Sequence, residues 1–189
     1  MTAWHAVVLI KPVAERKTRL REALSCETIT ALTDRMLHHV LDVLLHVDAI
    51  GSVSLLATEP LSAWQGRWIA DPGAGLNAAL AAAATTVPDR LVIVHADLPG
   101  LHRDDIAALI AAANAGAALA PDRRGTGTNA MALRDARGAF FGFGPDSFAR
   151  HCAAYPGAGE VRRAGLALDI DLPDDLALAI ARGHVPDLG

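Results

Sequence analysis

The chain has 189 residues, a formal net charge of −4 and 52% apolar residues. A protein of this length corresponds to one domain, and this apolar content can fill a core, which excludes an intrinsically disordered chain. The slightly acidic balance and the aromatic content of only 4% disfavour a nucleic-acid-binding protein, which typically carries excess positive charge and aromatic stacking surfaces. We therefore expect a single domain over residues 1–189.

The cysteines and the apolar segments indicate the cellular compartment of the protein. Cys26 and Cys152 are its two cysteines, and they stand far apart, so neither a disulfide framework nor a zinc motif is indicated. The sequence shows no secretory leader. Its longest apolar stretch, Ile106 to Ala120, is interrupted by Asn114 and Gly116 and is shorter than the roughly 20 residues of a membrane span. We expect a cytoplasmic protein that binds no membrane and no nucleic acid.

Strand and helix patterns alternate along the chain. The apolar run at 5–10 predicts a buried strand, and apolar residues at helical spacing predict a helix over about 28–47. Further strands are expected at 52–57, 67–70, 91–95, 117–120, 131–133 and 166–170, and further helices at 75–85, 103–115, 147–155 and 173–182. This alternation predicts a three-layer α/β fold, in which helices cover both faces of a mostly parallel sheet. Ligands of such folds bind at the carboxyl ends of the strands.

Acidic residues follow two of the predicted strands. Asp97 leaves the clearest buried strand, where a carboxylate is placed to hold a divalent metal, although a turn or cap role fits it equally. Asp169 and Asp171 stand two apart in an extended segment, so their side chains share one face. Asp97 with either of them would make an all-oxygen site suited to Mg²⁺. Asp174 and Asp175 fit the first turn of the last helix and are expected to cap it.

Two further loops are candidates for anion binding. Residues 125–129 read Gly-Thr-Gly-Thr-Asn beside Arg123 and Arg124, which is compatible with an oxyanion cradle or with a flexible surface loop. Residues 143–147 read Phe-Gly-Pro-Asp-Ser and lead into a predicted helix. A helix N-terminus with a serine hydroxyl suits a phosphate, and a simple N-cap explains the same pattern.

The loop after the first strand is basic. It contains Lys11, Arg16, Lys17 and Arg19, and the two lysines are the only ones in the chain. Such a loop could neutralise a triphosphate, or it could be a solvated basic surface. Near the second predicted helix, Asn77 follows a glycine turn and could contact a nucleotide or stabilise that turn. No Walker A or Gly-x-Gly-x-x-Gly motif is present, which disfavours P-loop ATPases and dinucleotide-binding dehydrogenases.

Taken in order, these stretches resemble the 2-phospho-L-lactate (or phosphoenolpyruvate) guanylyltransferase family of coenzyme F420 biosynthesis. The matching stretches are 11–20, 75–80, 96–99, 120–129, 143–151 and 169–176, and together they extend over nearly the whole chain. The Gly-Thr-Gly-Thr-Asn and Phe-Gly-Pro-Asp-Ser motifs are fairly specific for that family. The Asp-Leu-Pro and Asp-x-Asp motifs are shared with many nucleotidyltransferases.

The resemblance implies a nucleotide-diphospho-sugar-transferase-like, Rossmann-like fold that binds GTP and Mg²⁺. It implies metal ligation by Asp97, Asp169 and Asp171. It implies acceptor-phosphate binding by Thr128, Gly144 and Ser147. The nucleotide would contact Gly75, Leu76, Asn77 and Asp97, and the catalytic cations would be Lys11, Lys17 and Arg19.

The implied reaction joins GMP from GTP to the phosphate of 2-phospho-L-lactate, phosphoenolpyruvate or 3-phosphoglycerate and releases pyrophosphate. The acceptor phosphate already carries a charge of about −1.5 to −2 near neutral pH, so no protein base is needed. The alternatives are a molybdopterin- or sugar-phosphate nucleotidyltransferase and a non-catalytic nucleotide-binding module. The sequence leaves open which acid is the acceptor and whether the protein forms a homodimer.

Overall fold

The computed structural model describes residues 3–10, 17–61, 64–71 and 75–186. The strands are β1 (Trp4–Leu9), β2 (Ile50–Ala57), β3 (Arg67–Ala70), β4 (Leu91–His95), β5 (Ala117–Pro121), β6 (Thr128–Leu133) and β7 (Gly159–Glu160). The helices are α1 (Cys26–Leu45), α2 (Leu76–Ala84), α3 (Arg103–Ala112), α4 (Ser147–Ala154), α5 (Ala164–Ala167) and α6 (Pro173–Ala181), with 3-10 turns η2 (Thr18–Leu20) and η3 (Ala113–Ala115).

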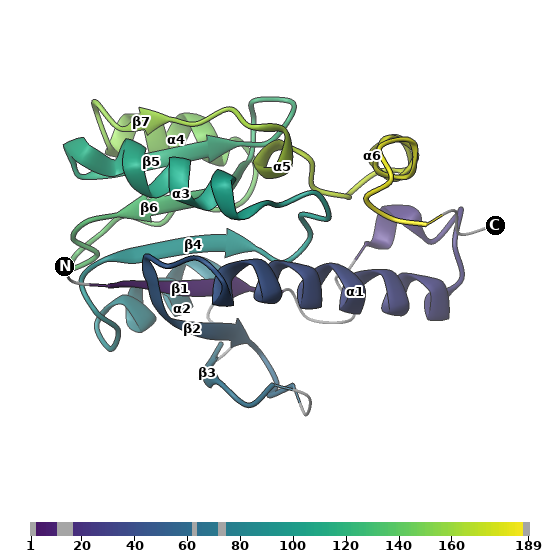
Figure 1. The fold of residues 1–189 in the computed structure, drawn as a ribbon, viewed down its shortest axis with the longest axis horizontal. Helices are drawn as coiled ribbons and strands as arrows, with labels where there is room; N and C mark the ends of the chain where they lie inside the picture. Colours follow the sequence, from purple (N-terminus) through teal and green to yellow (C-terminus); the bar gives the residue numbers. More distant parts are fainter. Residues whose placement is uncertain (1–2, 11–16, 62–63, 72–74, 187–189) are drawn as a thin grey trace.

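Within the described residues, the strands form one sheet of order β3-β2-β1-β4-β6-β5-β7 (Figure 1). β1, β2, β3 and β4 run parallel to one another, whereas β6 runs antiparallel to its neighbours β4 and β5. The register pairs Val94 with Ala130, so the start of β6 lies beside the end of β4. The mostly parallel sheet is as predicted, and the reversed β6 brings Thr128 and Asn129 to the sheet edge where Asp97 leaves β4.

Helices cover both faces of the sheet, which confirms the three-layer prediction. On one face, Ala6 and Val8 of β1 pack in a cluster with apolar residues of α1 and α3. On the other face, Val7 and Leu9 pack with α2 and with Phe143 of the loop before α4. Figure 1 shows α1 in front of the sheet and α2 behind it. Because successive side chains point to opposite faces, a strand covered on both sides is apolar throughout, which explains the continuous run.

A third cluster extends the core beyond the edge of the sheet. Leu20 of η2 packs with the first half of α1, with Leu168 and Ile170, and with Leu176 of α6. Helix α1 begins after Ser25, whose Oγ accepts a hydrogen bond from the Thr28 N–H at 3.1 Å. This cluster fixes η2 and the segment before α6 next to the strand ends, where the candidate site residues lie.

The predicted strand at 166–170 is wrong. Ala164–Ala167 form the short helix α5, and residues 168–171 continue without strand pairing. The alternating Leu166, Leu168 and Ile170 are all buried, but Leu166 belongs to the cluster under α3 and the other two belong to the cluster at α6. The carbonyls of Leu166 and Ala167 accept hydrogen bonds from the Asn129 side chain instead of from a neighbouring strand. The alternation of apolar residues at 166–170 therefore reflects burial in two separate clusters and does not indicate a strand.

Two further observations concern the cysteines and the length of the apolar helices. Cys26 and Cys152 are free and exposed. No helix among the described residues combines the length and the apolar character that a membrane crossing requires.

Candidate active site

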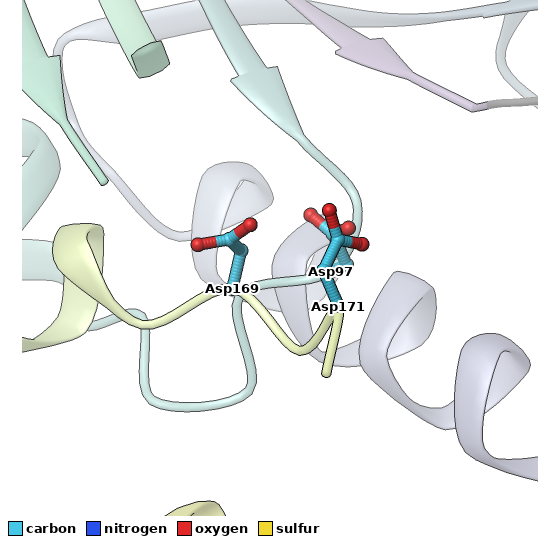
Figure 2. Close-up of side chains that lie close together, drawn as sticks. All are labelled: Asp97, Asp169 and Asp171. Carbon is cyan, nitrogen blue, oxygen red and sulfur yellow. The ribbon is translucent and has the colours of Figure 1, made fainter. Parts of the chain in front are cut away.

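Three carboxylates meet at the carboxyl end of β4. Oxygens of Asp97, Asp169 and Asp171 lie within 4.8 Å of one another (Figure 2). Asp97 follows β4, and the other two stand in the segment between α5 and α6. The Ile170 N–H donates to the Asp97 carbonyl at 3.3 Å, which joins the two segments directly. The sequence left open which of Asp169 and Asp171 would accompany Asp97, and the structure brings both to it.

The negative charges of the three carboxylates repel one another. Burial, together with the negative charge of Asp97, raises the pKa of Asp169 to about 6. The Asn129 side chain partly offsets this by donating a hydrogen bond to Asp169 Oδ1 at 3.2 Å. A cation between these groups would relieve the repulsion, and an all-oxygen donor set suits a hard divalent ion such as Mg²⁺.

Lys17 lies inside this acidic cluster. Its side chain is 5% exposed, and its ammonium donates hydrogen bonds to Asp97 and, at 3.0 Å, to Asp171 Oδ1. Burial opposes the charge, but Asp97 and Asp171 outweigh it and raise the pKa of Lys17 above its ordinary value. Its backbone has a φ of +49°, an unfavourable conformation for a residue other than glycine. The surrounding contacts thus hold Lys17 at the site at the cost of local strain.

The other two predicted catalytic cations have different positions. Arg19 is exposed within the η2 turn, close in sequence to Lys17. Lys11 lies outside the described residues.

Asn129 is a site residue that sequence reasoning did not single out. Its side chain is buried, and its Nδ2 group donates to Asp169 Oδ1 at 3.2 Å and to the Leu166 carbonyl at 3.0 Å. Asn129 therefore orients one carboxylate of the cluster and ties it to β6. Its place in the Gly-Thr-Gly-Thr-Asn motif was visible, but its target, 40 residues away, was not.

Asp175 caps α6 as predicted and also organises the loops around the site. Its fully buried carboxylate accepts hydrogen bonds from the Leu172 N–H at 2.8 Å and the Asp171 N–H at 3.2 Å. It also accepts from Arg123 Nε at 2.7 Å and Arg124 Nη2 at 2.9 Å. The two arginines expected beside an anion cradle are thus paired with Asp175, and they connect the 122–127 loop to the segment of Asp171.

Thr128 and Ser147, predicted to bind an acceptor phosphate, lie in direct contact. The Thr128 N–H donates to Ser147 Oγ at 2.9 Å, and both residues are only 2% exposed. The N–H groups of Ser147 and Phe148 at the start of α4 already donate to the carbonyls of Gly144 and Thr126. The hydroxyl groups, rather than these two helix N–H groups, are therefore the donors left for an anion. Gly144, with a φ of +120°, turns the loop into α4.

His151 of α4 completes this arrangement and was not predicted as a site residue. Its Nδ1 lies 2.9 Å from Thr128 Oγ1, and its Nε2 accepts a hydrogen bond from the Gly142 N–H at 3.0 Å. Burial, with smaller effects from the charges of Arg150 and His95, lowers the pKa of His151 to about 4. The imidazole is therefore neutral near neutral pH.

Asn77 of α2, which was predicted to contact the nucleotide, is hydrogen-bonded to the loop before α4. Gly75 precedes α2 with a φ of +91°, and Leu76 is partly buried at its first turn. Asn77 Nδ2 donates to the Phe143 carbonyl at 3.0 Å, and Asn77 Oδ1 accepts from the Phe143 N–H at 2.8 Å. Asn77 therefore stabilises the loop before α4, and its contact with a nucleotide stays a prediction.

Acid is expected to destabilise the fold through two buried histidines. Burial, with a smaller effect of Arg67, lowers the pKa of His5 to about 4, and the pKa of His151 is lowered to the same value. Each unfolded imidazole binds a proton near pH 6.5, so between about pH 6.5 and 4 the unfolded state binds more protons. The stabilisation is complete above pH 6.5 and is lost as the pH falls, by up to about 3 kcal/mol for each residue.

Urea unfolding at several pH values in this window would measure the effect. The pH dependence should become shallower in His5→Gln and in His151→Gln, and should persist in a control substitution of the exposed His38. A wild-type unfolding free energy that stays constant across the window would contradict the expectation.

The sequence is similar to those of known proteins over nearly its whole length. A protein family described as "Guanylyl transferase CofC like" matches residues 4–183. The phosphoenolpyruvate guanylyltransferase of Sphaerobacter thermophilus is 39% identical over 195 residues, a match that covers 96% of this chain and 93% of that protein. The phosphoenolpyruvate guanylyltransferase of Roseiflexus castenholzii is 38% identical, with 95% of this chain and 90% of that protein covered.

A solved structure confirms the predicted fold type. A crystal structure from Desulfovibrio desulfuricans, described as a nucleotide-diphospho-sugar transferase, superposes with a TM-score of 0.74. The match covers 100% of this chain and 90% of that one at 17% sequence identity. The likeness at this identity concerns the fold alone, and that fold is the nucleotide-diphospho-sugar-transferase-like architecture expected from the sequence.

Proposed function

Because this chain belongs to the family of CofC-like guanylyl transferases and is a nucleotidyltransferase, we propose that it joins GMP from GTP to the phosphate of a small phosphorylated acid. Pyrophosphate is the other product, and the reaction serves coenzyme F420 biosynthesis. Phosphoenolpyruvate, the acid in the names of the relatives, is the first candidate acceptor, ahead of 2-phospho-L-lactate and 3-phosphoglycerate. The main support is one juxtaposition: the carboxylate cluster stands beside the Thr128–Ser147 pair, connected through Asn129.

The residues that would hold Mg²⁺ are Asp97, Asp169 and Asp171. Their oxygens are close enough to share one ion, and burial followed by the negative charge of Asp97 raises the pKa of Asp169. When bound, Mg²⁺ would supply positive charge opposite the triphosphate of GTP.

The chain's own cations would act on the same phosphates. In the proposal, the Lys17 ammonium, held at the acidic cluster, provides a fixed positive charge beside the triphosphate. Arg19, exposed on the same turn, and Lys11 would contribute further charge, and Gly75 and Leu76 would adjoin the nucleotide. Charge placed in advance lowers the barrier because it need not reorganise during the reaction.

The acceptor would be aligned by Thr128, Gly144 and Ser147. One oxygen of its phosphate attacks the α-phosphorus of GTP, a new phosphorus–oxygen bond forms, and the bond to the pyrophosphate oxygen breaks. The attacking oxygen is already anionic near neutral pH, so alignment of two bound substrates supplies what a general base would otherwise add.

The decisive experiment is an acceptor screen. The purified protein is incubated with GTP, Mg²⁺ and each of the three acids, and products are identified by mass spectrometry. Parallel reactions replace GTP by ATP or CTP, and the acid by a sugar phosphate or molybdopterin. A guanylylated acid would support the proposal. Transfer only to a sugar phosphate or molybdopterin, or GTP binding without any product, would contradict it.

Ser147→Ala is expected to raise the KM for the acceptor by about tenfold or more, because a hydrogen bond to a charged group is lost. The KM for GTP should change less than twofold on this account. Steady-state kinetics with each substrate varied in turn would measure both constants. Ser25→Ala is the matched control, because it removes the cap of α1 and should alter stability while sparing both constants. Equal increases of the two KM values in Ser147→Ala would indicate that Ser147 has only a structural role at the start of α4.

A further inference from the structure

We propose that His151 is a positioning residue that turns the Thr128 hydroxyl into a hydrogen-bond donor aimed at the acceptor phosphate. This inference rests on the proposed function, because it concerns the same acceptor subsite. It assigns a role to a residue that need not touch either substrate.

The hydrogen bonds of His151 select one tautomer. The Gly142 N–H can only donate, so Nε2, 3.0 Å away, must accept through its lone pair. A neutral imidazole carries a single proton, and that proton is then on Nδ1. The lowered pKa of His151, about 4, supports the neutral form. Nδ1–H therefore donates to Thr128 Oγ1, at 2.9 Å.

This choice determines where the Thr128 hydroxyl proton can point. Because Thr128 Oγ1 accepts from His151, its own proton must be directed elsewhere. Ser147 Oγ likewise accepts, from the Thr128 N–H at 2.9 Å, which leaves the serine proton to be donated. Among the described residues neither hydroxyl has a protein acceptor for its proton, and both residues are only 2% exposed. Two buried donors side by side match the oxygens of a phosphate.

Packing holds the His151 ring in the required orientation. The ring makes an edge contact with Phe143 at a centroid distance of 4.9 Å and another with Phe140 at 6.1 Å. Phe143 is itself anchored by the two backbone hydrogen bonds to Asn77. The ring is therefore constrained by two aromatic contacts as well as by hydrogen bonds at both nitrogens.

Two substitutions of His151 test its hydrogen bonds to Thr128 and to Gly142 separately. Asn in place of His151 puts an amide N–H₂ near the position of Nδ1, where it can still donate to Thr128. Gln reaches toward the position of Nε2, so it can accept from Gly142 but no longer supplies the Thr128 donor. Both variants remove the ring from its aromatic contacts, so a loss of packing affects both.

Isothermal titration with phosphoenolpyruvate, in the presence of Mg²⁺ and a GTP analogue with a methylene group in place of the oxygen between the α- and β-phosphates, would measure acceptor affinity without turnover. The expected result is that His151→Gln weakens binding by roughly tenfold, as Thr128→Val does, whereas His151→Asn stays within about threefold of wild type. The double variant Thr128→Val/His151→Gln should bind no more weakly than Thr128→Val alone. Affinity for the GTP analogue should be equal in all of them.

The outcomes distinguish this inference from the proposed function. Equal losses in His151→Asn and His151→Gln, or additive losses in the double variant, would overturn the positioning role and leave the acceptor site standing. Absence of acid binding to the wild-type protein would overturn both. Independently of any substrate, ¹⁵N spectra of labelled histidine rings should show the His151 proton on Nδ1, with His151→Asn identifying the signal. A proton on Nε2 would refute the inference.

Discussion

Asp97→Asn is expected to lower the rate of pyrophosphate release by roughly 10²–10³-fold while the protein remains folded. The substitution keeps the shape of the side chain but removes one of three carboxylates from the cluster, and with it a ligand for the divalent ion. It also removes one of the two acidic partners of Lys17. Asp171 still pairs with Lys17, and the part of the Asp169 pKa shift that comes from the charge of Asp97 is relieved, so the protein should remain folded.

A coupled assay of pyrophosphate in the presence of GTP, Mg²⁺ and the acceptor would measure the loss, and circular dichroism would report folding. Asp174→Asn is the matched control, because Asp174 is an exposed acid in the first turn of α6, close in sequence to Asp171. Its turnover should equal that of wild type. Unimpaired turnover of Asp97→Asn would remove Asp97 from the metal site.

Asp175→Ala is expected to lower the free energy of unfolding by about 1–3 kcal/mol, because it leaves the N–H groups of Asp171 and Leu172 without their acceptor. The carboxylate is fully buried and joins Arg123 and Arg124 to the backbone of Asp171 and Leu172. Its loss would also remove the counter-charge of the two guanidinium groups, but their side chains are 33% and 36% exposed, so water compensates most of that loss.

Urea denaturation would measure the difference, with Asp174→Ala as the exposed neighbour expected to change stability by no more than about 0.5 kcal/mol. Burial opposes ionisation of Asp175, but hydrogen bonds from Arg124 and Arg123 outweigh it and hold its pKa below the ordinary value. Its contribution is therefore present above the ordinary aspartate pKa and is lost as the pH falls below that value. Equal stability of the two alanine variants would contradict a central role for Asp175.

The sequence alone predicted the strands, helices and candidate ligands that depend on a local pattern of residues. The apolar runs and helical spacings located the central strands and the long helices, because a buried strand or an amphipathic helix must repeat its apolar residues at a fixed period. The motif residues Asp97, Asp169 and Asp171 were recognised as candidate ligands, and the structure brings them together. The family was likewise recognisable from short motifs in a conserved order along this one chain, and the comparisons confirm it.

The prediction failed where one pattern fits two physical causes. The alternating leucines and isoleucine at 166–170 fit a strand, but they are buried in two separate clusters, with a short helix at Ala164–Ala167. Arg123 and Arg124 fit either an anion cradle or a surface loop by composition, and the structure pairs both with Asp175. Composition shows which charges are available, and only the folded chain shows which of them are paired.

The tertiary structure alone decided the partners of the site residues. Lys17 contacts Asp97 and Asp171, which are 80 and 154 residues away, and Asn129 contacts Asp169 across 40 residues. The proton position on His151 follows from Gly142 and Thr128, which no periodicity connects. Sequence determined which chemical groups this protein has and roughly which elements bear them. Their pKa values, tautomers and partners depend on distances of a few ångströms between distant segments, and these exist only once the sheet and its loops have folded.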